Sequence, residues 1–377
     1  MVVDQFIRWC ETAGVEARRR GLLILAQAWA EGALAPSERV AAEEAFLLFL
    51  DDPSDRVRRV LAEIVAPHAD APLGVLLGLC EDIEPIALLT ASTAPALSER
   101  QLCHVVDVRP PSVQAAIAGR PFLPGVVVRH IAEHASREAC LALLANQSTR
   151  PAPESLALMA ERFPSDGTVR AALLESPRLP AAARQSLVEA HAAALSDCGF
   201  VRGLLGSARA RDIVRGAADK AAVAIGREAA SAGQSADFVE HMRASGQLTE
   251  AFLFRSLFDG NVDLFAAALA ALSGYSDKRV RAVLVEARER PLGSLLAAAG
   301  LDRSGVPVVR SALVAWREAA QEGRRGTRAG VVTEALRVAA SAAPKPALRD
   351  LVALLGRLAA ETVRDEARPA RRRAAAA

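Results

Sequence analysis

Apolar residues recur along this chain at helical spacing, in short segments that are separated by turns. In residues 54–63, SDRVRRVLAE, Val57 and Val60 fall on the same face of a predicted helix. Residues 276–286, SDKRVRAVLVE, place Val280 in the same position of a second helix. No stretch shows the sustained apolar–polar alternation, bounded by hairpin turns, that predicts strands. The pattern therefore predicts an all-α fold.

The helical pattern repeats with a period of about 28 residues. One marker is a proline that follows a turn and precedes a new apolar helix, at separations of 29, 29 and 27 residues: Pro95, Pro124, Pro153 and Pro180. Proline is favoured at a helix start because its missing N–H would be unpaired there anyway. A second marker, in the preceding helices, recurs at separations of 29, 27 and 56 residues: Val57, Ile86, Val113 and Val169. Two markers with one period predict an α-solenoid of stacked short helix pairs, followed by further helical hairpins.

Changes in this pattern suggest five regions along the chain. Residues 207–237 contain no proline and lose the repeat, which indicates a long connecting helix that ends near Gly233. The regions expected are capping helices in 1–45, helical repeats in 46–200, a connecting helix in 201–237, helical hairpins in 238–366 and a disordered basic tail in 367–377.

An Asp-x-x-Val-Arg opening, with one residue of slack in two of its three copies, resembles the helix start of HEAT/armadillo-type α-solenoids. Three Asp–Arg pairs carry it: Asp55 with Arg58, Asp166 with Arg170, and Asp277 with Arg281. The resemblance implies that these side chains hydrogen-bond across adjacent repeats, rather than that the arginines bind phosphate. The order of segments 47–63, 70–82 and 246–274 also resembles a bacterial family of unknown function with HEAT-like repeats.

Composition and charge narrow the function classes. The net charge is +2 and aromatic residues make up 4% of the chain, unlike a dedicated nucleic-acid-binding protein. Nucleic-acid binding stays as the second hypothesis, through the Arg-rich loop 323–328, the tail 368–373, or a groove lined by arginines: Arg18, Arg19, Arg20, Arg324, Arg325 and Arg328. Five single cysteines and no bilayer-length apolar run favour a cytoplasmic protein without a membrane span.

The segment HIAEH, His130 to His134, matches a five-residue zinc motif with Glu133 as its acid. A metal-dependent hydrolase at these three residues is a distant alternative, because no further ligand segment follows. The positions nine residues after each proline alternate in charge, which favours a solvated ladder: His104, Glu133, Arg162 and Glu189. The sequence also contains no phosphate-loop, dinucleotide-binding or nucleophile-elbow motif. We therefore expect no catalytic residue, no metal site and no cofactor.

The leading hypothesis is a non-catalytic scaffold or regulatory adaptor that binds a protein or peptide along the second helices of the repeats. Positions seven residues after each proline are apolar and predicted to be core: Leu102, Ile131, Ala160 and Leu187. Positions six and nine residues after each proline are predicted to form one exposed face. That partner face comprises Gln101, His104, His130, Glu133, Arg162 and Glu189, together with Met159 and Ser186.

Overall fold

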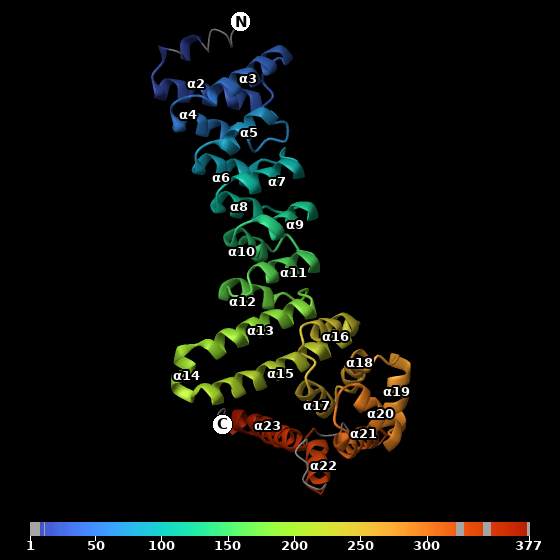
Figure 1. The fold of residues 1–377 in the computed structure, drawn as a ribbon. Coiled ribbons are helices and arrows are strands. Elements are labelled where there is room, and N and C mark those ends of the chain that lie inside the picture. The colour runs from blue at the N-terminus through green and yellow to red at the C-terminus, as the bar shows by residue number, and fades with distance from the viewer. Residues whose placement is uncertain (1–7, 11, 322–327, 342–347, 375–377) are drawn as a thin grey trace. The chain divides into compact units, whose positions relative to one another are not determined.

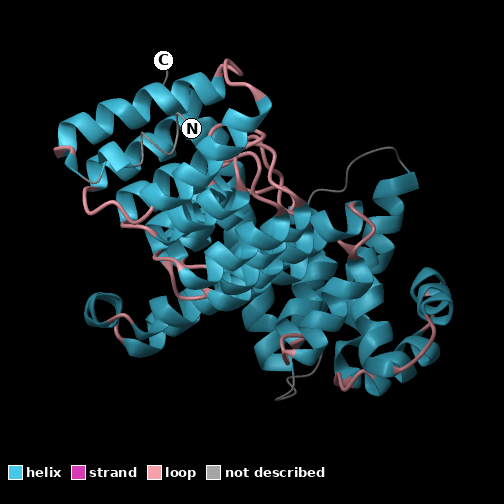
Figure 2. Ribbon diagram, turned by 90° about the horizontal axis from the view of Figure 1, so that it is seen from above, coloured by secondary structure: helices cyan, strands magenta, loops and turns pink. Residues whose placement is uncertain are grey.

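The structure is a computed structural model that describes residues 8–10, 12–321, 328–341 and 348–374. Within these residues every regular element is a helix, and Figure 2 shows the helices joined by short loops with no strand. The all-α prediction is therefore confirmed. No helix among the described residues combines the length and the apolar character needed to cross a bilayer. The chain divides into two compact units, residues 1–180 (unit 1) and 181–377 (unit 2).

Unit 1 is built from short helices, most of them eight to sixteen residues long. A π-helical turn, Leu61–Val65, directly continues helix α4. The elements are α2 (Val15–Ala30), α3 (Pro36–Phe49), α4 (Asp55–Val60), η1 (Leu61–Val65), α5 (Leu73–Glu81), α6 (Glu84–Thr93), α7 (Glu99–Val108), α8 (Pro111–Ala118), α9 (Gly125–His134), α10 (Arg137–Ala145), α11 (Pro153–Arg162) and α12 (Gly167–Glu175).

Alternate helices of unit 1 contact one another and form two rows. In the even row α4 contacts α6, α6 contacts α8, α8 contacts α10, and α10 contacts α12. In the odd row α9 contacts both α7 and α11 (Figure 1). The predicted core markers lie inside the even row and are nearly inaccessible to solvent: Val57, Ile86, Val113 and Val169. Apolar residues at helical spacing thus account for the packing of each row.

Three of the four periodic prolines lie at helix starts. Pro124 is the N-cap of α9, Pro153 is the first residue of α11, and Pro180 directly precedes the first residue of α13. Pro95 instead lies in the turn before α7, because Ser98 and Gln101 form a capping box that fixes the start of this helix. The predicted core positions are all buried: Leu102, Ile131, Ala160 and Leu187.

Unit 2 contains longer helices and begins earlier than the sequence pattern indicates. Its first helix packs on α15, so the boundary between the two units lies at residue 180, within the region 46–200 that the sequence predicts as helical repeats. The elements are α13 (Ala181–Asp197), α14 (Gly199–Leu205), α15 (Ser207–Ser231), α16 (Ser235–Ala244), α17 (Glu250–Phe258), α18 (Val262–Ser273), α19 (Asp277–Glu286), α20 (Glu289–Ala298), η2 (Arg303–Gly305), α21 (Val306–Gln321), α22 (Arg328–Ser341) and α23 (Leu348–Ala374).

Helices α15 and α23 lie in two regions for which the sequence makes specific predictions. The long connecting helix expected within 201–237 corresponds to α15, Ser207–Ser231. The basic tail expected to be disordered from residue 367 is instead helical as far as Ala374, because α23 runs through it, while residues 375–377 lie outside the described residues.

The core of unit 2 is richer in aromatic side chains than that of unit 1. Five of them are nearly fully buried: Phe238, Phe252, Phe254, Phe258 and Phe265. Gly226 lets α15 approach this core closely, since a Cβ there would lie 2.5 Å from Leu264 and 2.9 Å from Phe238. The close approach fixes α15 against α16 and α18, and α15 in turn forms one wall of the pocket described below.

Candidate functional site

The HIAEH segment lies on α9 and its polar groups contact other side chains. The Nε2 atom of His130 is 2.7 Å from Oδ1 of Asp107 on α7, which links two helices of the odd row. His134 Nε2 is 3.7 Å from Glu133, and Glu133 accepts a 2.8 Å hydrogen bond from Arg129, which lowers the pKa of its carboxyl. Among the described residues, no group of three or more His, Cys, Asp or Glu side chains is arranged to hold a metal ion.

Arg162 of the predicted partner face contacts the neighbouring helix. Its guanidinium donates to the backbone carbonyls of Ala132, at 2.7 Å, and Ala135, at 2.6 Å, near the C-terminus of α9. These carbonyls have no partner within their own helix, so the contact satisfies them. Met159, one turn earlier on α11, is fully buried, and its predicted exposure is wrong. The cause is that this side of α11 packs on α9 in the odd row.

The other residues of the predicted face lie in different surroundings. Gln101 accepts a 2.7 Å hydrogen bond from the backbone N–H of Ser98 and so helps to start α7. His104 is exposed on α7. Glu189 lies on α13 in unit 2, where it lines a pocket. Ser186, also on α13, lies 3.2 Å from His241.

In two of the three Asp–Arg pairs that resembled a HEAT helix start, the charged side chains bind residues outside the pair. Arg58 on α4 donates to both carboxylate oxygens of Asp82, at 2.6 and 2.7 Å, rather than to Asp55. Asp82 lies two residues before Glu84, the first residue of α6, which is the next helix of the even row. Asp166, the N-cap of α12, accepts from Arg137 of α10 at 2.6 Å. In both cases the bridge runs from one helix to a residue just before the next helix of the row.

The remaining two arginines of the motif behave differently. Arg170 donates to the carbonyl of Pro164 at 3.4 Å rather than to an acid. Arg281 pairs with Asp277 of its own helix at 2.7 Å and also with Asp263 of α18. The Asp277–Arg281 pair therefore forms as an ordinary i, i+4 contact on α19.

Sequence reasoning missed a set of polar side chains that bind backbone carbonyls at the end of the previous helix of the even row. Arg120 donates to the carbonyls of Ala91 and Ala94, at 2.8 and 2.7 Å, and burial lowers its pKa. Asn146 donates to the carbonyls of Ala118 and Arg120, at 2.9 and 2.7 Å. Both follow an apolar helix end, which is the signal that could have found them. These contacts use the long polar side chains of unit 1 for packing between helices.

Three of the arginines considered for a nucleic-acid groove form ion pairs with acidic side chains. Arg18 forms a 2.7 Å ion pair with Asp52, and Arg19 forms a 2.8 Å ion pair with Glu16. Arg328 pairs with Asp259 at 2.6 Å. Arg324, Arg325 and most of the loop 323–328 lie outside the described residues.

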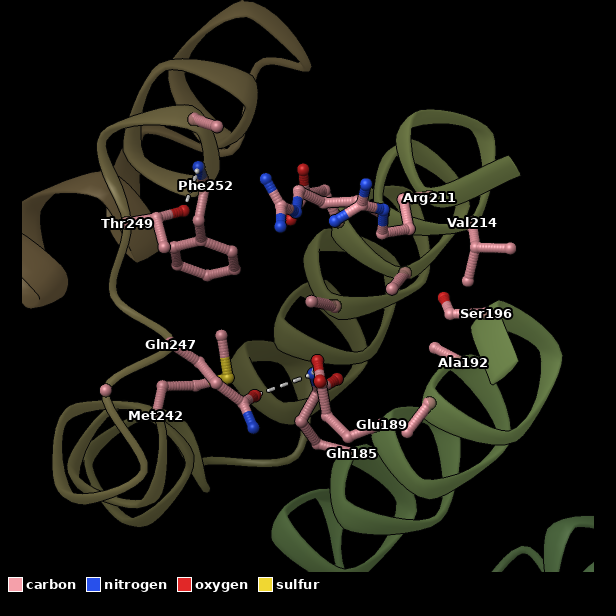
Figure 3. A pocket seen from close by; sticks show the side chains of 17 residues that line it. Gln185, Glu189, Ala192, Ser196, Arg211, Val214, Met242, Gln247, Thr249 and Phe252 are labelled. Carbon is pink, nitrogen blue, oxygen red and sulfur yellow. Dashed lines mark hydrogen bonds between the residues drawn. The ribbon is translucent and has the colours of Figure 1, made fainter. Parts of the chain in front are cut away.

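A pocket of about 620 Å³ in unit 2 is lined by a buried polar side chain, Gln185, that has an atom without a hydrogen-bond partner among the described residues. Its walls come from α13, α15, the end of α16 and the loop that leads into α17 (Figure 3). Much of the lining is apolar: Ala192, Ala193, Val214, Ala218, Ala222, Met242 and Phe252. The volume falls within the range of about 300–1,000 Å³ that is typical of small-ligand pockets.

A glutamine lies at the polar end of this pocket. Gln185 is fully buried, and its Nε2 donates to Oε1 of Glu189 and to Oε1 of Gln247, each at 2.9 Å. Figure 3 shows the three side chains together, apart from Arg211. The Oε1 atom of Gln185 is buried and accepts no hydrogen bond from any described residue. A buried acceptor without a donor costs free energy, so a donor that reached this atom would stabilise the protein.

Two carboxyl groups line the same pocket. Burial raises the pKa of Glu189, with a further contribution from the nearby Asp219 and an opposing one from the Gln185 hydrogen bond. Burial also raises the pKa of Asp219, against the charges of Arg255 and Arg215. No ion pair among the described residues includes Glu189. Its carboxylate is therefore partly desolvated without a cationic partner.

This arrangement of polar and charged side chains in the pocket suits the binding of a ligand. Acceptor atoms gather at the Gln185 end, whereas Arg211 of α15 contributes positive charge elsewhere in the lining. The sequence pattern indicates only Glu189 of this site, because Gln185, Asp219 and Gln247 lie on two helices and a loop. A polar residue in an alanine-rich helix is ordinarily predicted to face solvent.

Comparisons with known proteins identify the family. Residues 86–352 match the model of a family described as an uncharacterised protein conserved in bacteria (DUF2336). Neither the curated proteins nor the solved structures include a match to this chain. Because the family match covers well over half of the 377 residues, the chain belongs to this family of uncharacterised bacterial proteins.

Proposed function

We propose that this protein is a non-catalytic, cytoplasmic scaffold or regulatory adaptor that binds a protein or peptide partner. Unit 1 serves as a HEAT-like solenoid with a period of about 28 residues, and unit 2 carries the binding pocket. All five cysteines are free, which suits a reducing compartment. The partner inserts a side chain into the pocket lined by Gln185 and Glu189.

The contacts between helices of unit 1 support the solenoid part of this proposal. Arg109 donates to the carbonyl of Asp82 across 27 residues, Asn146 to that of Ala118 across 28, and Arg137 to Asp166 across 29. Contacts that recur at a nearly constant separation are expected where each repeat packs only on its neighbours. Solenoids generally present extended surfaces for recognition.

The observation that carries the binding function is the pocket of unit 2. It holds a buried acceptor, Oε1 of Gln185, with no donor among the described residues, and a glutamate without an ion pair. Groups that serve only the fold are normally satisfied within it, as those around Arg120 are. Unsatisfied groups that line an open pocket favour a ligand supplied from outside.

A pocket-filling variant tests the proposal. Ala192 lines the pocket, whereas Ala194, two residues along the same helix, is exposed outside it. Full-length wild type, Ala192→Phe and Ala194→Phe are used to capture proteins from bacterial lysate with quantitative mass spectrometry. The enriched partner is then purified, and its affinity for each variant is measured.

We expect Ala192→Phe to weaken binding of that partner at least tenfold and Ala194→Phe to leave it unchanged. Cross-links from the partner should fall on α13, α15 or the loop 246–249. A partner whose affinity is the same for all three proteins would contradict the proposed role of the pocket. Circular dichroism and thermal unfolding confirm that each variant is folded.

A further inference from the structure

We propose that the Gln185–Glu189 end of the pocket binds one organic cation, an ammonium or guanidinium group at the end of an aliphatic chain. This inference rests on the proposed function and specifies the chemistry that the partner presents, namely a lysine or arginine side chain. Three observations carry it: the inventory of hydrogen-bond acceptors, the balance of charge, and the shape and polarity of the walls.

The polar end of the pocket has hydrogen-bond acceptors without donors. Both donor contacts assigned to the Gln185 amide, to Glu189 and to Gln247, use its Nε2, which leaves its buried Oε1 without a donor. Glu189 uses only one carboxylate oxygen in that contact. This end of the pocket therefore offers a ligand two acceptors, Oε1 of Gln185 and the second carboxylate oxygen of Glu189. Ammonium brings three N–H donors and guanidinium five, and neither carries an acceptor.

The balance of charge also favours a cation. Glu189 forms no ion pair among the described residues, and the second carboxyl group, Asp219, is close enough to disfavour its ionisation. A ligand cation placed against Glu189 would restore the ionised carboxylate and satisfy Gln185 at the same time. Arg211, which lies apart from Gln185 and Glu189, repels a cation and so restricts it to the other end of the pocket.

An organic cation fits better than a metal ion. The described residues include no group of three or more His, Cys, Asp or Glu side chains that could hold a metal. Calcium takes about six to eight oxygen ligands, more than this end of the pocket supplies. Lysine and arginine side chains instead bury their methylene groups along apolar surface while their charged ends bind polar atoms. Met242 and Phe252 supply such apolar surface here.

Methionine labelling provides a reporter at the site. The chain has three methionines, of which Met242 lines the pocket and Met159 is buried in unit 1. Full-length protein with ¹³C-methyl methionine is titrated with the N-acetyl, N-methylamide derivatives of lysine, arginine and norleucine. Norleucine retains the aliphatic chain and lacks the charge. n-Butylammonium is the probe for a free amine.

We expect the lysine or arginine derivative to shift the Met242 methyl signal and leave that of Met159 unchanged. The charged derivative should bind at least tenfold more tightly than norleucine. Glu189→Gln should remove most of this preference, because the variant keeps the shape of the side chain and loses its charge. Glu228→Gln, at an exposed position of α15, is the matched control and should retain the preference.

Several other outcomes would contradict the cation site or identify the source of the cation. Equal binding of lysine, arginine and norleucine derivatives would overturn the cation site, as would a preference that survives Glu189→Gln. If n-butylammonium binds as tightly as the amino-acid derivatives, the cation site stands and its source is a small amine. If Ala192→Phe abolishes partner binding while Glu189→Gln does not, the scaffold function stands and the cation inference fails.

Discussion

The two units use their buried polar groups in different ways. In unit 1, Arg120 and Asn146 bind backbone carbonyls of the previous helix in the even row, and Arg58 binds Asp82, just before the next helix of that row. In unit 2, Gln185 keeps an acceptor without a donor, and Glu189 is desolvated without a cation. The comparison indicates that a ligand could supply the missing hydrogen-bond donor and positive charge in unit 2. Unit 1 uses its polar side chains for contacts between helices, whereas unit 2 leaves some of them without a partner beside a pocket.

The units also differ in how far apart in sequence their partners lie. The Arg58–Asp82 ion pair of unit 1 joins residues 24 positions apart. The buried Arg255 of unit 2 pairs with Glu361, 106 positions away, through two hydrogen bonds of 2.9 and 3.0 Å. Burial alone would raise the pKa of Glu361, but the contact with Arg255 and the nearby charges of Arg328 and Lys220 together outweigh it, and the pKa is lowered. Unit 2 thus depends on contacts that no local repeat can supply.

The largest expected effect concerns the aromatic core of unit 2. Phe258 is fully buried and stacks on Phe254, with ring centroids 6.3 Å apart. Phe258→Ala should lower the free energy of unfolding of unit 2 by about 3–5 kcal/mol, since it leaves a cavity in a close-packed core. Hydrogen exchange followed by mass spectrometry measures this loss within unit 2. Phe200→Ala is the control, because that ring is 74% exposed; equal losses would contradict the assigned core.

The next effect tests the carbonyl contacts of unit 1. Arg120→Ala removes the donors of two buried carbonyls, those of Ala91 and Ala94. We expect a loss of about 2–3 kcal/mol in the stability of unit 1, because each buried acceptor left without a donor costs about 1–3 kcal/mol. Chemical denaturation with a probe in unit 1 measures it. A loss below about 0.5 kcal/mol would mean that water replaces the guanidinium at no cost.

A smaller, pH-dependent effect tests the carboxyl group of the pocket. The pKa of Glu189 is raised, so its contribution to stability is fully present below the ordinary value of 4.5 and is lost as the pH rises through the folded-state value. Glu189→Gln has no such loss. The stability of Glu189→Gln relative to wild type should therefore increase between pH 4 and pH 7.5.

Chemical denaturation of both proteins at the two pH values measures this difference. Asp219 has a raised pKa as well, but it is present in both proteins and largely cancels. Glu228→Gln is again the control and should show no such increase. A stability difference for Glu189→Gln that stays constant or decreases with pH would show that Glu189 is not desolvated in the folded protein.

The smallest expected effect separates the two faces of one helix in unit 1. Arg59 forms an exposed i, i+4 ion pair with Glu63, whereas Leu61 between them is fully buried. Arg59→Ala should cost under about 0.5 kcal/mol, as exposed pairs usually do. Leu61→Ala should cost about 2–5 kcal/mol. Similar unfolding midpoints for the two variants would mean that these faces are assigned wrongly.

The apolar periodicity predicted the helices and their buried sides well. Leu102, Ile131, Ala160 and Leu187, chosen by their distance from a proline, are all buried. The same counting failed at Met159, and it gave no indication that Arg162 binds the carbonyls of α9. Periodicity identifies the side of a helix that packs on its own pair, but it does not show which side a neighbouring row covers.

The sequence by itself determined the helical class, most helix positions and the core positions, because these follow from local spacing of apolar residues and from helix starts at proline, serine and aspartate. Only the tertiary structure decided the partners of the charged side chains. Arg58 binds Asp82 rather than the nearby Asp55, since the backbone brings the next helix of the row within reach. The tertiary structure also brings Gln185 and Gln247, which are 62 residues apart, within hydrogen-bond distance of each other. Long-range packing rather than local pattern sets that distance.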